Sequence, residues 1–207
     1  MIDKSRIMQI ACVTMVVGIL LLTACGGRTP PAKFYTLQPV EQSSTGKSLP
    51  LNVALAIGPV AIPAALDRAE IVTRDAGNAI SFSEYHRWAG PLEEDIASVM
   101  AQNIATLLES DRVTPFTLEN LFFQPTHRVV ININRYDSQL AKEFLIDATW
   151  SIKDLKSRKL LLIRNSTLRE PLASAEYEEL VAAQSKALAA LSKIIAEAVL
   201  ESVPENK

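Results

Sequence analysis

The chain has 207 residues, and its 21 basic and 23 acidic side chains give a formal net charge of −2. Hydrophobic residues make up 48% of it, which is enough to build a core in one domain. The even charge balance argues against nucleic acid as a partner, because nucleic acid selects a basic surface, and it also argues against a polybasic membrane patch.

The first predicted element is an export signal. Lys4 and Arg6 precede a largely apolar run from Ile7 to Leu22, and Leu22-Thr23-Ala24-Cys25 closes the run. A basic start, an apolar middle and a small residue before the cleavage point are typical of a secretory signal. The run is shorter than the roughly 20 apolar residues that a membrane-spanning helix needs.

The closing residues Leu22-Thr23-Ala24-Cys25 resemble the bacterial lipobox. The resemblance implies cleavage before Cys25, a diacylglyceryl group on its thiol and acylation of the new amine. Each buried methylene contributes about 0.8 kcal/mol of membrane affinity, so two or three long chains would anchor the protein firmly. By resemblance to bacterial sorting rules, Gly26 in place of Asp favours the outer membrane over retention in the inner membrane. The alternative is an ordinary cleaved signal that leaves Cys25 as a lone thiol.

Cysteine usage simplifies the mature chain. Cys12 lies in the predicted signal and Cys25 would carry lipid, so the folded part has no thiol left for a disulfide or a Cys-based metal site. We therefore predict a signal peptide over 1–24, a lipidated Cys25 with its tether over 25–33, and a single domain over 34–203.

The first half of the domain reads as strands. Aromatic and β-branched residues predict a short strand at 34–37, and the polar stretch 38–50 predicts a loop. Alternation predicts a strand over 51–60, with Leu51, Val53, Leu55 and Ile57 on one face. The segments 71–74 and 79–82 flank Asp75-Ala76-Gly77-Asn78 and predict a hairpin.

Two helices are predicted, one in each half. The first opens at Pro91 with three acidic residues in its first turn, and its apolar stripe to Leu108 is interrupted only by Asn103. The second spans about 175–202 and ends at Pro204. Strands at 129–134, 144–153 and 160–163 lie between them, and the turn at 154–159 predicts that the last two pair antiparallel. This order favours an α+β fold, with an antiparallel or mixed sheet and both main helices on one face in a single pair of layers.

The sequence shows little that could carry out chemistry. His86 and His127 share no metal-ligand spacing and are expected to be structural or surface residues. No nucleophile elbow, phosphate-binding glycine loop or helical histidine pair is present. We therefore predict that the protein is not an enzyme and uses no cofactor and no metal.

The stretch from Ile57 to Pro91 carries the most specific signal. It contains Ile57-Gly58-Pro59-Val60, Ile62-Pro63, Leu66-Asp67-Arg68, Glu70-Ile71-Val72-Thr73-Arg74 and His86-Arg87-Trp88-Ala89-Gly90-Pro91-Leu92. Together with Phe34-Tyr35-Thr36-Leu37 after the lipobox, these elements resemble the ABC-type transport auxiliary lipoprotein family. The resemblance runs from Cys25 to about Leu200, and Gly90 departs from the acidic residue expected between Trp88 and Pro91.

The resemblance implies a role without a reaction. Members accompany MCE-domain proteins, which form tunnels between the two membranes. This chain would be the outer-membrane-anchored, non-catalytic subunit of a lipid transport system, with an MCE-domain tunnel protein and an inner-membrane transport protein as partners. Self-association into a homo-oligomer stays open. Two other functions are alternatives: a substrate-binding lipoprotein of an ABC importer, for which the mature chain is short, and an envelope hydrolase, for which no serine has an activating setting.

Asp67, Arg68, Arg87 and Trp88 are the candidate partner interface. We expect them to gather at one end of the sheet, presented by loops on a rigid scaffold. The alternative for the same stretch is purely structural: Gly58, Pro59 and Pro63 would shape a turn, and Trp88 would belong to the core.

Overall fold

The computed structural model describes residues 30–75, 77–118, 121 and 123–203. The chain divides into the units Met1–Pro31 and Ala32–Lys207, and all elements described below lie in the second. The predicted signal, Cys25 and the tether up to residue 29 lie outside the described residues, as do Glu119, Asn120 and Phe122. Among the described helices, none combines the length and the apolar character needed to cross a membrane.

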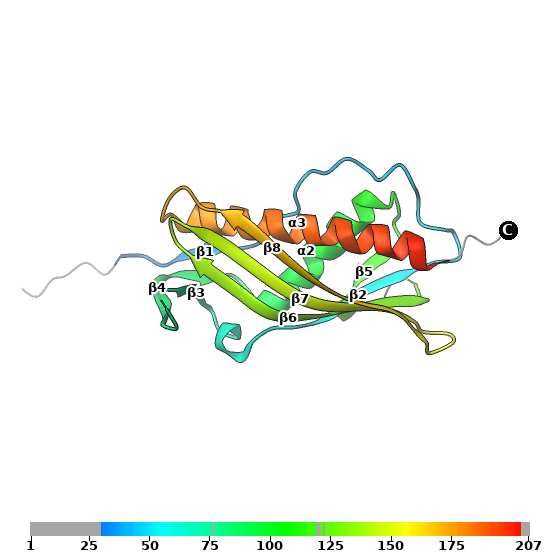
Figure 1. Cartoon of the computed structure of the whole chain (residues 1–207), viewed down its shortest axis with the longest axis horizontal. Coiled ribbons are helices and arrows are strands. Elements are labelled where there is room, and N and C mark those ends of the chain that lie inside the picture. The colour runs from blue at the N-terminus through cyan, green and yellow to red at the C-terminus, as the bar shows by residue number, and fades with distance from the viewer. Residues whose placement is uncertain (1–29, 76, 119–120, 122, 204–207) are drawn as a thin grey trace, which may run out of the picture. The chain divides into compact units, whose positions relative to one another are not determined.

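The described residues of this unit form eight β-strands and two α-helices (Figure 1). The first half contains β1 (Lys33–Tyr35), β2 (Leu55–Ala61), the 3-10 turn η2 (Ala64–Leu66), β3 (Glu70–Arg74), β4 (Ile80–Trp88) and α2 (Leu92–Leu107). The second half contains β5 (Val113–Pro115), the 3-10 turn η3 (Phe116–Leu118), β6 (His127–Gln139), β7 (Glu143–Asp154), β8 (Leu160–Pro171) and α3 (Tyr177–Ser202).

The larger sheet has five strands in the order β5-β2-β6-β7-β8. β2 pairs in parallel with β5 and β6, whereas β6, β7 and β8 form an antiparallel meander, so the sheet is mixed. The expected antiparallel pair β7–β8 is confirmed. β8 runs to Pro171, well past the predicted end at Ile163. Its second part is mostly polar and alternates between exposed and half-buried side chains, so it carries no continuous apolar run.

The smaller sheet has the order β1-β4-β3. The predicted hairpin is present as β3 and β4, with Val72 opposite Phe82. β1 pairs in parallel with β4, which places Phe34 opposite Arg87. The α+β class is therefore confirmed, but the strands are divided between two sheets. The parallel partner of β1 lies about 50 residues away, beyond the reach of local sequence patterns.

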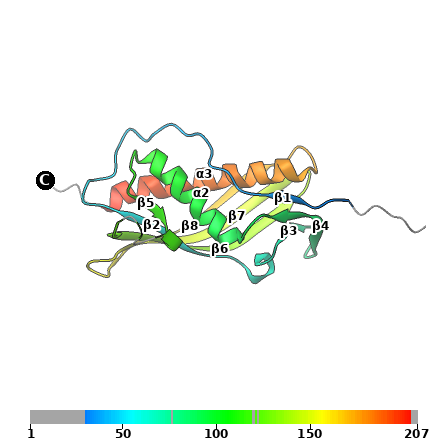
Figure 2. The same cartoon turned by 180° about the vertical axis from the view of Figure 1, so that it is seen from behind.

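Both helices cover the same face of the larger sheet (Figures 1 and 2). α2 contacts β2 and β5, α3 contacts β7 and β8, and the two helices pack against each other. The core between these layers includes Leu55, Ile57, Ile104, Trp150 and Leu188, each at most 1% exposed. Fully burying one such side chain contributes about 1.5–3 kcal/mol, so this layer contact is the main source of stability.

The strand predicted to begin at Leu51 begins at Leu55 instead. Leu51 is 87% exposed and lies in a turn, while Ala56 is as fully buried as Leu55 and Ile57. β2 has a neighbouring strand on each edge and also contacts α2 and η3, and its first four residues are all buried. The simple alternation predicted for this strand was therefore wrong at its start.

The polar loop before β2 is fastened to the helices, which explains the interrupted stripe of α2. The backbone N–H of Val40 donates to Asn103 Oδ1 at 3.2 Å, and Asn103 is 2% exposed. The N–H of Leu37 donates to Asp95 at 2.8 Å and the N–H of Gln38 donates to Ser185 at 3.1 Å. Figure 2 shows this blue-to-cyan segment running beside the helices from the β1 end to the β2 end.

Gly58 occupies a position that other residues tolerate poorly. Its φ is +110°, and a Cβ built there would lie 3.0 Å from Phe116 Cβ. We predict that Gly58→Ala lowers the free energy of unfolding by about 2 kcal/mol or more, through backbone strain and overpacking. Chemical denaturation of the mature chain measures this.

Gly90→Ala is the matched control, because no atom lies within 4 Å of its built Cβ. It should change stability by less than about 0.5 kcal/mol. Equal effects of the two substitutions would contradict the assignment of strain to Gly58.

Candidate functional site at the three-stranded sheet

Strand β1, which continues the predicted tether, is fastened by a polar cluster. The Tyr35 hydroxyl lies 2.8 Å from His86 Nδ1 and donates to Glu178 Oε1 at 3.1 Å. Lys33 Nζ lies 3.0 Å from the same carboxylate. The His86 ring stacks on Tyr177 with centroids 3.9 Å apart. The cluster joins β1, β4 and the start of α3.

The pKa values of Tyr35 and Glu178 indicate that this cluster holds the structure together. Burial and the neighbouring Glu178 carboxylate raise the pKa of Tyr35 to about 12. The hydrogen bonds from Lys33 and Tyr35 hold the pKa of Glu178 below its usual value. At neutral pH Tyr35 is therefore a protonated phenol beside a charged carboxylate, a state that supports hydrogen bonding and gives no nucleophile.

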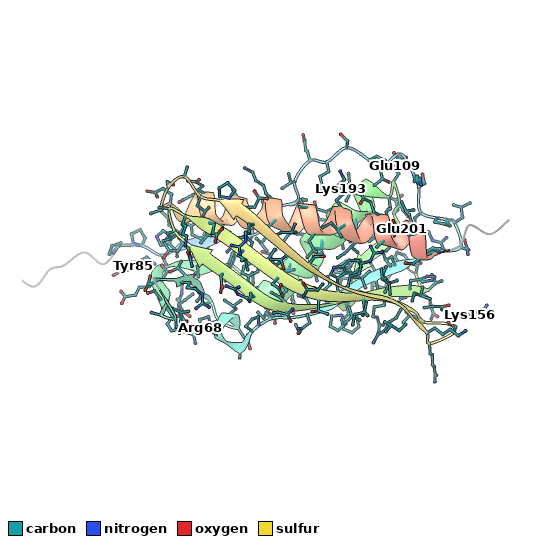
Figure 3. All side chains as sticks on the ribbon, viewed as in Figure 1. Arg68, Tyr85, Glu109, Lys156, Lys193 and Glu201 are labelled. Atoms are coloured by element: carbon teal, nitrogen blue, oxygen red, sulfur yellow. The ribbon has the colours of Figure 1, made fainter. Side chains whose placement is uncertain are left out.

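Asp67 and Arg68 lie in the turn that leads into β3, near Arg87 on β4. Asp67 ends η2 and is exposed, as is Arg68, whose guanidinium lies 3.8 Å from the centroid of the Phe82 ring. Arg87 forms an ion pair with Glu70, its register partner on β3. The hydrogen bond from Arg87, with the charge of Arg68 nearby, holds the pKa of Glu70 below its usual value. Figure 3 shows Arg68 at the same end of the unit as Tyr85.

Trp88 is placed differently from these charged residues. It is 5% exposed and belongs to the main core cluster. Its backbone N–H donates to the Ala69 carbonyl at 2.7 Å, which fixes the turn that carries Arg68. Arg87 and Trp88 also belong to strand β4, whereas the sequence led us to expect loops. Trp88 therefore supports this surface from beneath and does not present a side chain on it.

A second ionic cluster lies where β3 meets β6. Arg74 Nη2 lies 2.9 Å from Asp137 Oδ1, and Arg135 Nη2 lies 2.6 Å from Asp137 Oδ2. Partial burial alone would raise the pKa of Asp137, but the hydrogen bonds from the two arginines outweigh it and hold that pKa below its usual value. This cluster links the two sheets and lines a cavity of about 150 Å³ together with Leu66, Val72 and Ile80.

Further hollows of the described part have linings that mix polar and apolar surface. One of them, about 1060 Å³, lies between the loop 43–50 and the end of α3, and it is lined mainly by Ser, Thr, Lys and Glu side chains. His86 and His127 lie on strands of different sheets. Within the described residues, no three His, Cys, Asp or Glu side chains converge on a metal position.

Comparison with known proteins agrees with this architecture. The model of the ABC-type transport auxiliary lipoprotein component family matches residues 35–196. Protein XCC0632 from Xanthomonas campestris, of the DUF330 family, has a crystal structure with a TM-score of 0.70 at 14% identity, covering 83% of this chain and 96% of that one. An uncharacterized protein of known crystal structure gives a TM-score of 0.65 at 16% identity, covering 82% and 99%. No curated protein matches the sequence.

Because the family model covers most of its length, the chain belongs to the ABC-type transport auxiliary lipoprotein family. The two structures establish the shared fold, and the family description establishes that the chain is an auxiliary component of transport. The resemblance seen in the Ile57 to Pro91 stretch is thereby confirmed.

Asp137 provides a test of the link between the sheets. Its folded pKa lies below the unfolded value, so it contributes stability above that value, and the contribution is lost as the pH falls through the folded pKa. We predict that Asp137→Asn lowers the free energy of unfolding by about 1–2 kcal/mol at neutral pH, because Arg74 loses its partner in a partly buried site. The difference from wild type should shrink towards pH 3.

Thermal melts across this pH range measure the effect, and Asp111→Asn, at an exposed position, is the control. A destabilisation by Asp137→Asn that is independent of pH would contradict an electrostatic origin.

Proposed function

We propose that this chain is the non-catalytic, lipid-anchored adaptor of an MCE-type intermembrane lipid transport system, held at the periplasmic face of the outer membrane. The observation that carries the proposal is a transport-auxiliary domain over 35–196 that begins ten residues after a complete lipobox ending at Cys25. The divisions 1–24, 25–33 and 34–203 belong to the same proposal. Gly26 after the lipidated Cys25 favours the outer membrane.

The polar cluster around Tyr35 supports the proposal of an anchored adaptor. An adaptor that holds a partner protein at a defined position relative to a membrane needs its tether to be attached rigidly to the folded domain. Lys33, the last residue of the predicted tether, contacts Glu178, and Tyr35 contacts both Glu178 and His86, so β1 is joined to β4 and α3. The candidate partner surface is formed by Asp67 and Arg68 in the turn before β3 and by Arg87 on β4 of the same sheet, with Trp88 buried beneath it.

The size and lining of the hollows favour a protein that docks onto other proteins over one that carries a lipid in a pocket. A small-molecule pocket is about 300–1,000 Å³ and mostly apolar. The cavity at the sheet junction is about 150 Å³, and the larger hollow beside α3 has polar walls. Neither suits an acyl chain. An adaptor that orients other proteins fits these features better than a substrate-binding lipoprotein, and the raised pKa of Tyr35 gives no support to a hydrolase.

The anchor is tested at Cys25. We predict that Cys25→Ser abolishes acylation and leaves an uncleaved precursor in the inner membrane, because the lipobox thiol is the acceptor. Metabolic labelling with an acyl probe, followed by separation of the two membranes, measures this, and Cys12→Ser is the matched control. Equal labelling of the Cys25 variant and the wild type would refute the anchor.

The partner surface is tested at Arg68. Exposed charges at an interface steer and orient partners, so Arg68→Glu should weaken co-purification of an MCE-domain protein by severalfold with little change in the melting curve. Lys47→Glu, on the loop beside α3, makes the same charge change elsewhere and should have no effect. Arg87→Glu is less informative, because it would place two carboxylates together with Glu70.

Native co-purification of the acylated protein also tests the function itself. Recovery of an importer permease without an MCE-domain protein would favour the substrate-binding alternative. Normal recovery of the MCE-domain protein with Arg68→Glu would move the interface to another face.

A further inference from the structure

The β7–β8 hairpin ends in a concentration of basic side chains. Lys153, Lys156, Arg158 and Lys159 are all exposed and fall within seven residues. Asp154 is the one acidic residue between Ser151 and Ile163. The even charge balance of the whole chain predicted no basic membrane patch, but the fold gathers positive charge at this tip.

Hydrogen bonds of Asp154 stabilise the turn at this tip. Asp154 Oδ1 accepts hydrogen bonds from the N–H groups of Lys156 at 2.8 Å and Ser157 at 3.0 Å, and its Oδ2 accepts from the Ser157 hydroxyl at 2.8 Å. The N–H of Asp154 donates to the Lys159 carbonyl at 2.9 Å. The Asp154 carboxylate is therefore engaged within the turn, while the basic side chains extend outward.

Exposed aliphatic side chains continue from this tip along β8. Leu160 is 54% exposed, Leu161 37% and Ile163 61%. Leu160 lies opposite Lys153, and a register shift between Ile152 and Lys153 adds a residue to β8 at this point. β8 is the last strand of its sheet, so nothing in the sheet covers its outer edge. The tip thus combines aliphatic groups with cations.

The hairpin lies at the far end of the unit from β1. Figure 1 shows the yellow hairpin projecting beyond the body at the end opposite β1, and Figure 3 shows Lys156 there. The 13 residues of β6 alone span about 43 Å. The eight residues from Cys25 to Lys33 reach about 28 Å at most. Anchor and hairpin could therefore engage one membrane when the long axis lies along its surface.

We propose that the β7–β8 hairpin is a second membrane contact, which binds anionic phospholipid in the same leaflet that holds the acylated Cys25. Basic side chains near an anionic surface each raise affinity about fivefold, and the stems of Lys and Arg lie along apolar surface while their charges reach the headgroups. Leu160, Leu161 and Ile163 would enter the interfacial layer. The location of this contact rests on the proposed lipid anchor, while its lipid chemistry rests on the hairpin alone.

The spread of these groups favours lipid over an acidic protein. The cations lie on both sides of the turn, and the aliphatic groups follow one strand. Headgroups diffuse laterally and can match such a spread, whereas a protein offers carboxylates at fixed positions. An acyl anchor also holds the hairpin at high local concentration, so weak binding is sufficient.

Vesicle binding tests the lipid chemistry. The mature chain 25–207 with Cys25→Ser retains the whole described core and can be used without its lipid. It should sediment with vesicles of phosphatidylglycerol and phosphatidylcholine, bind less as salt rises, and ignore phosphatidylcholine alone. Lys156→Glu with Lys159→Glu should weaken binding at least tenfold. Lys47→Glu with Lys193→Glu, the same charge change elsewhere, should leave binding near the wild-type level.

A second measurement tests the arrangement on one membrane. Acylated protein carrying Lys156→Cys, labelled with a polarity-sensitive dye, should show a blue shift on anionic vesicles without clustering them. Clustering would place the hairpin on an opposing bilayer and overturn the single-leaflet arrangement. Equal binding to both vesicle types, or no effect of the double reversal, would overturn the lipid site.

These assays separate the hairpin proposal from the transport proposal. The vesicles contain no MCE-domain protein, so failure to bind leaves the adaptor role untouched. If the double reversal instead loses a partner protein in native co-purification while vesicle binding is unchanged, the hairpin is a protein-docking site and the lipid proposal is wrong.

Discussion

The packing of α2 and α3 on one face of the five-stranded sheet is the contact on which the rest of the molecule depends. The helices bring Ile104, Leu188 and Ile195 against Leu55, Ile131 and Trp150, and all of these are at most 1% exposed. The mature chain is expected to have no thiol for a crosslink, so this apolar layer carries the stability. Both helices use the same face of this sheet (Figures 1 and 2). The smaller sheet joins it separately, through the contact of β3 with β6 and the ion pairs of Asp137.

The outer face of that sheet is stabilised by hydrogen bonds. Asp147 accepts from Asn134 at 2.7 Å, from Asn165 at 3.3 Å and from Thr167 at 2.6 Å, across three neighbouring strands. The hydrogen bonds from Thr167 and Asn134 hold the pKa of Asp147 below its usual value. A face satisfied in this way needs no covering layer. The three-stranded sheet and the β7–β8 hairpin differ from this face, because each presents an exposed apolar side chain beside a cation. These pairs are Phe82 with Arg68 and Leu160 with Lys153.

The sequence predicted the elements that local patterns determine. The β3–β4 hairpin, both helices and the β7–β8 pair follow from turn residues and apolar periodicity, and each is present. Helix α2 begins one residue after the predicted start, because Pro91 takes the position before the first helical residue. Strand β6 continues past 134 through a register shift near Ile133 that reverses the alternation. The parallel pairing of β1 with β4 depends on contacts between distant segments, so no local pattern could reveal it.

The same limit applied to the candidate site. Sequence reasoning selected Asp67, Arg68, Arg87 and Trp88, and the fold brings the first three near one another while burying the fourth. It did not find Glu70 as the partner of Arg87, or the contacts of Tyr35 with His86 and Glu178, because these cross between strands or reach α3.

The distribution of charge shows why a chain-wide balance is a weak guide to surface function. A formal net charge of −2 averages over groups that the fold separates. Arg87 is paired with Glu70, and Arg74 and Arg135 share Asp137, so two carboxylates offset most of these three positive charges where they lie. In the hairpin, Asp154 faces the turn backbone while Lys153, Lys156, Arg158 and Lys159 extend into solvent. An approaching surface responds to potential within about 10 Å, so it meets the local excess and not the average.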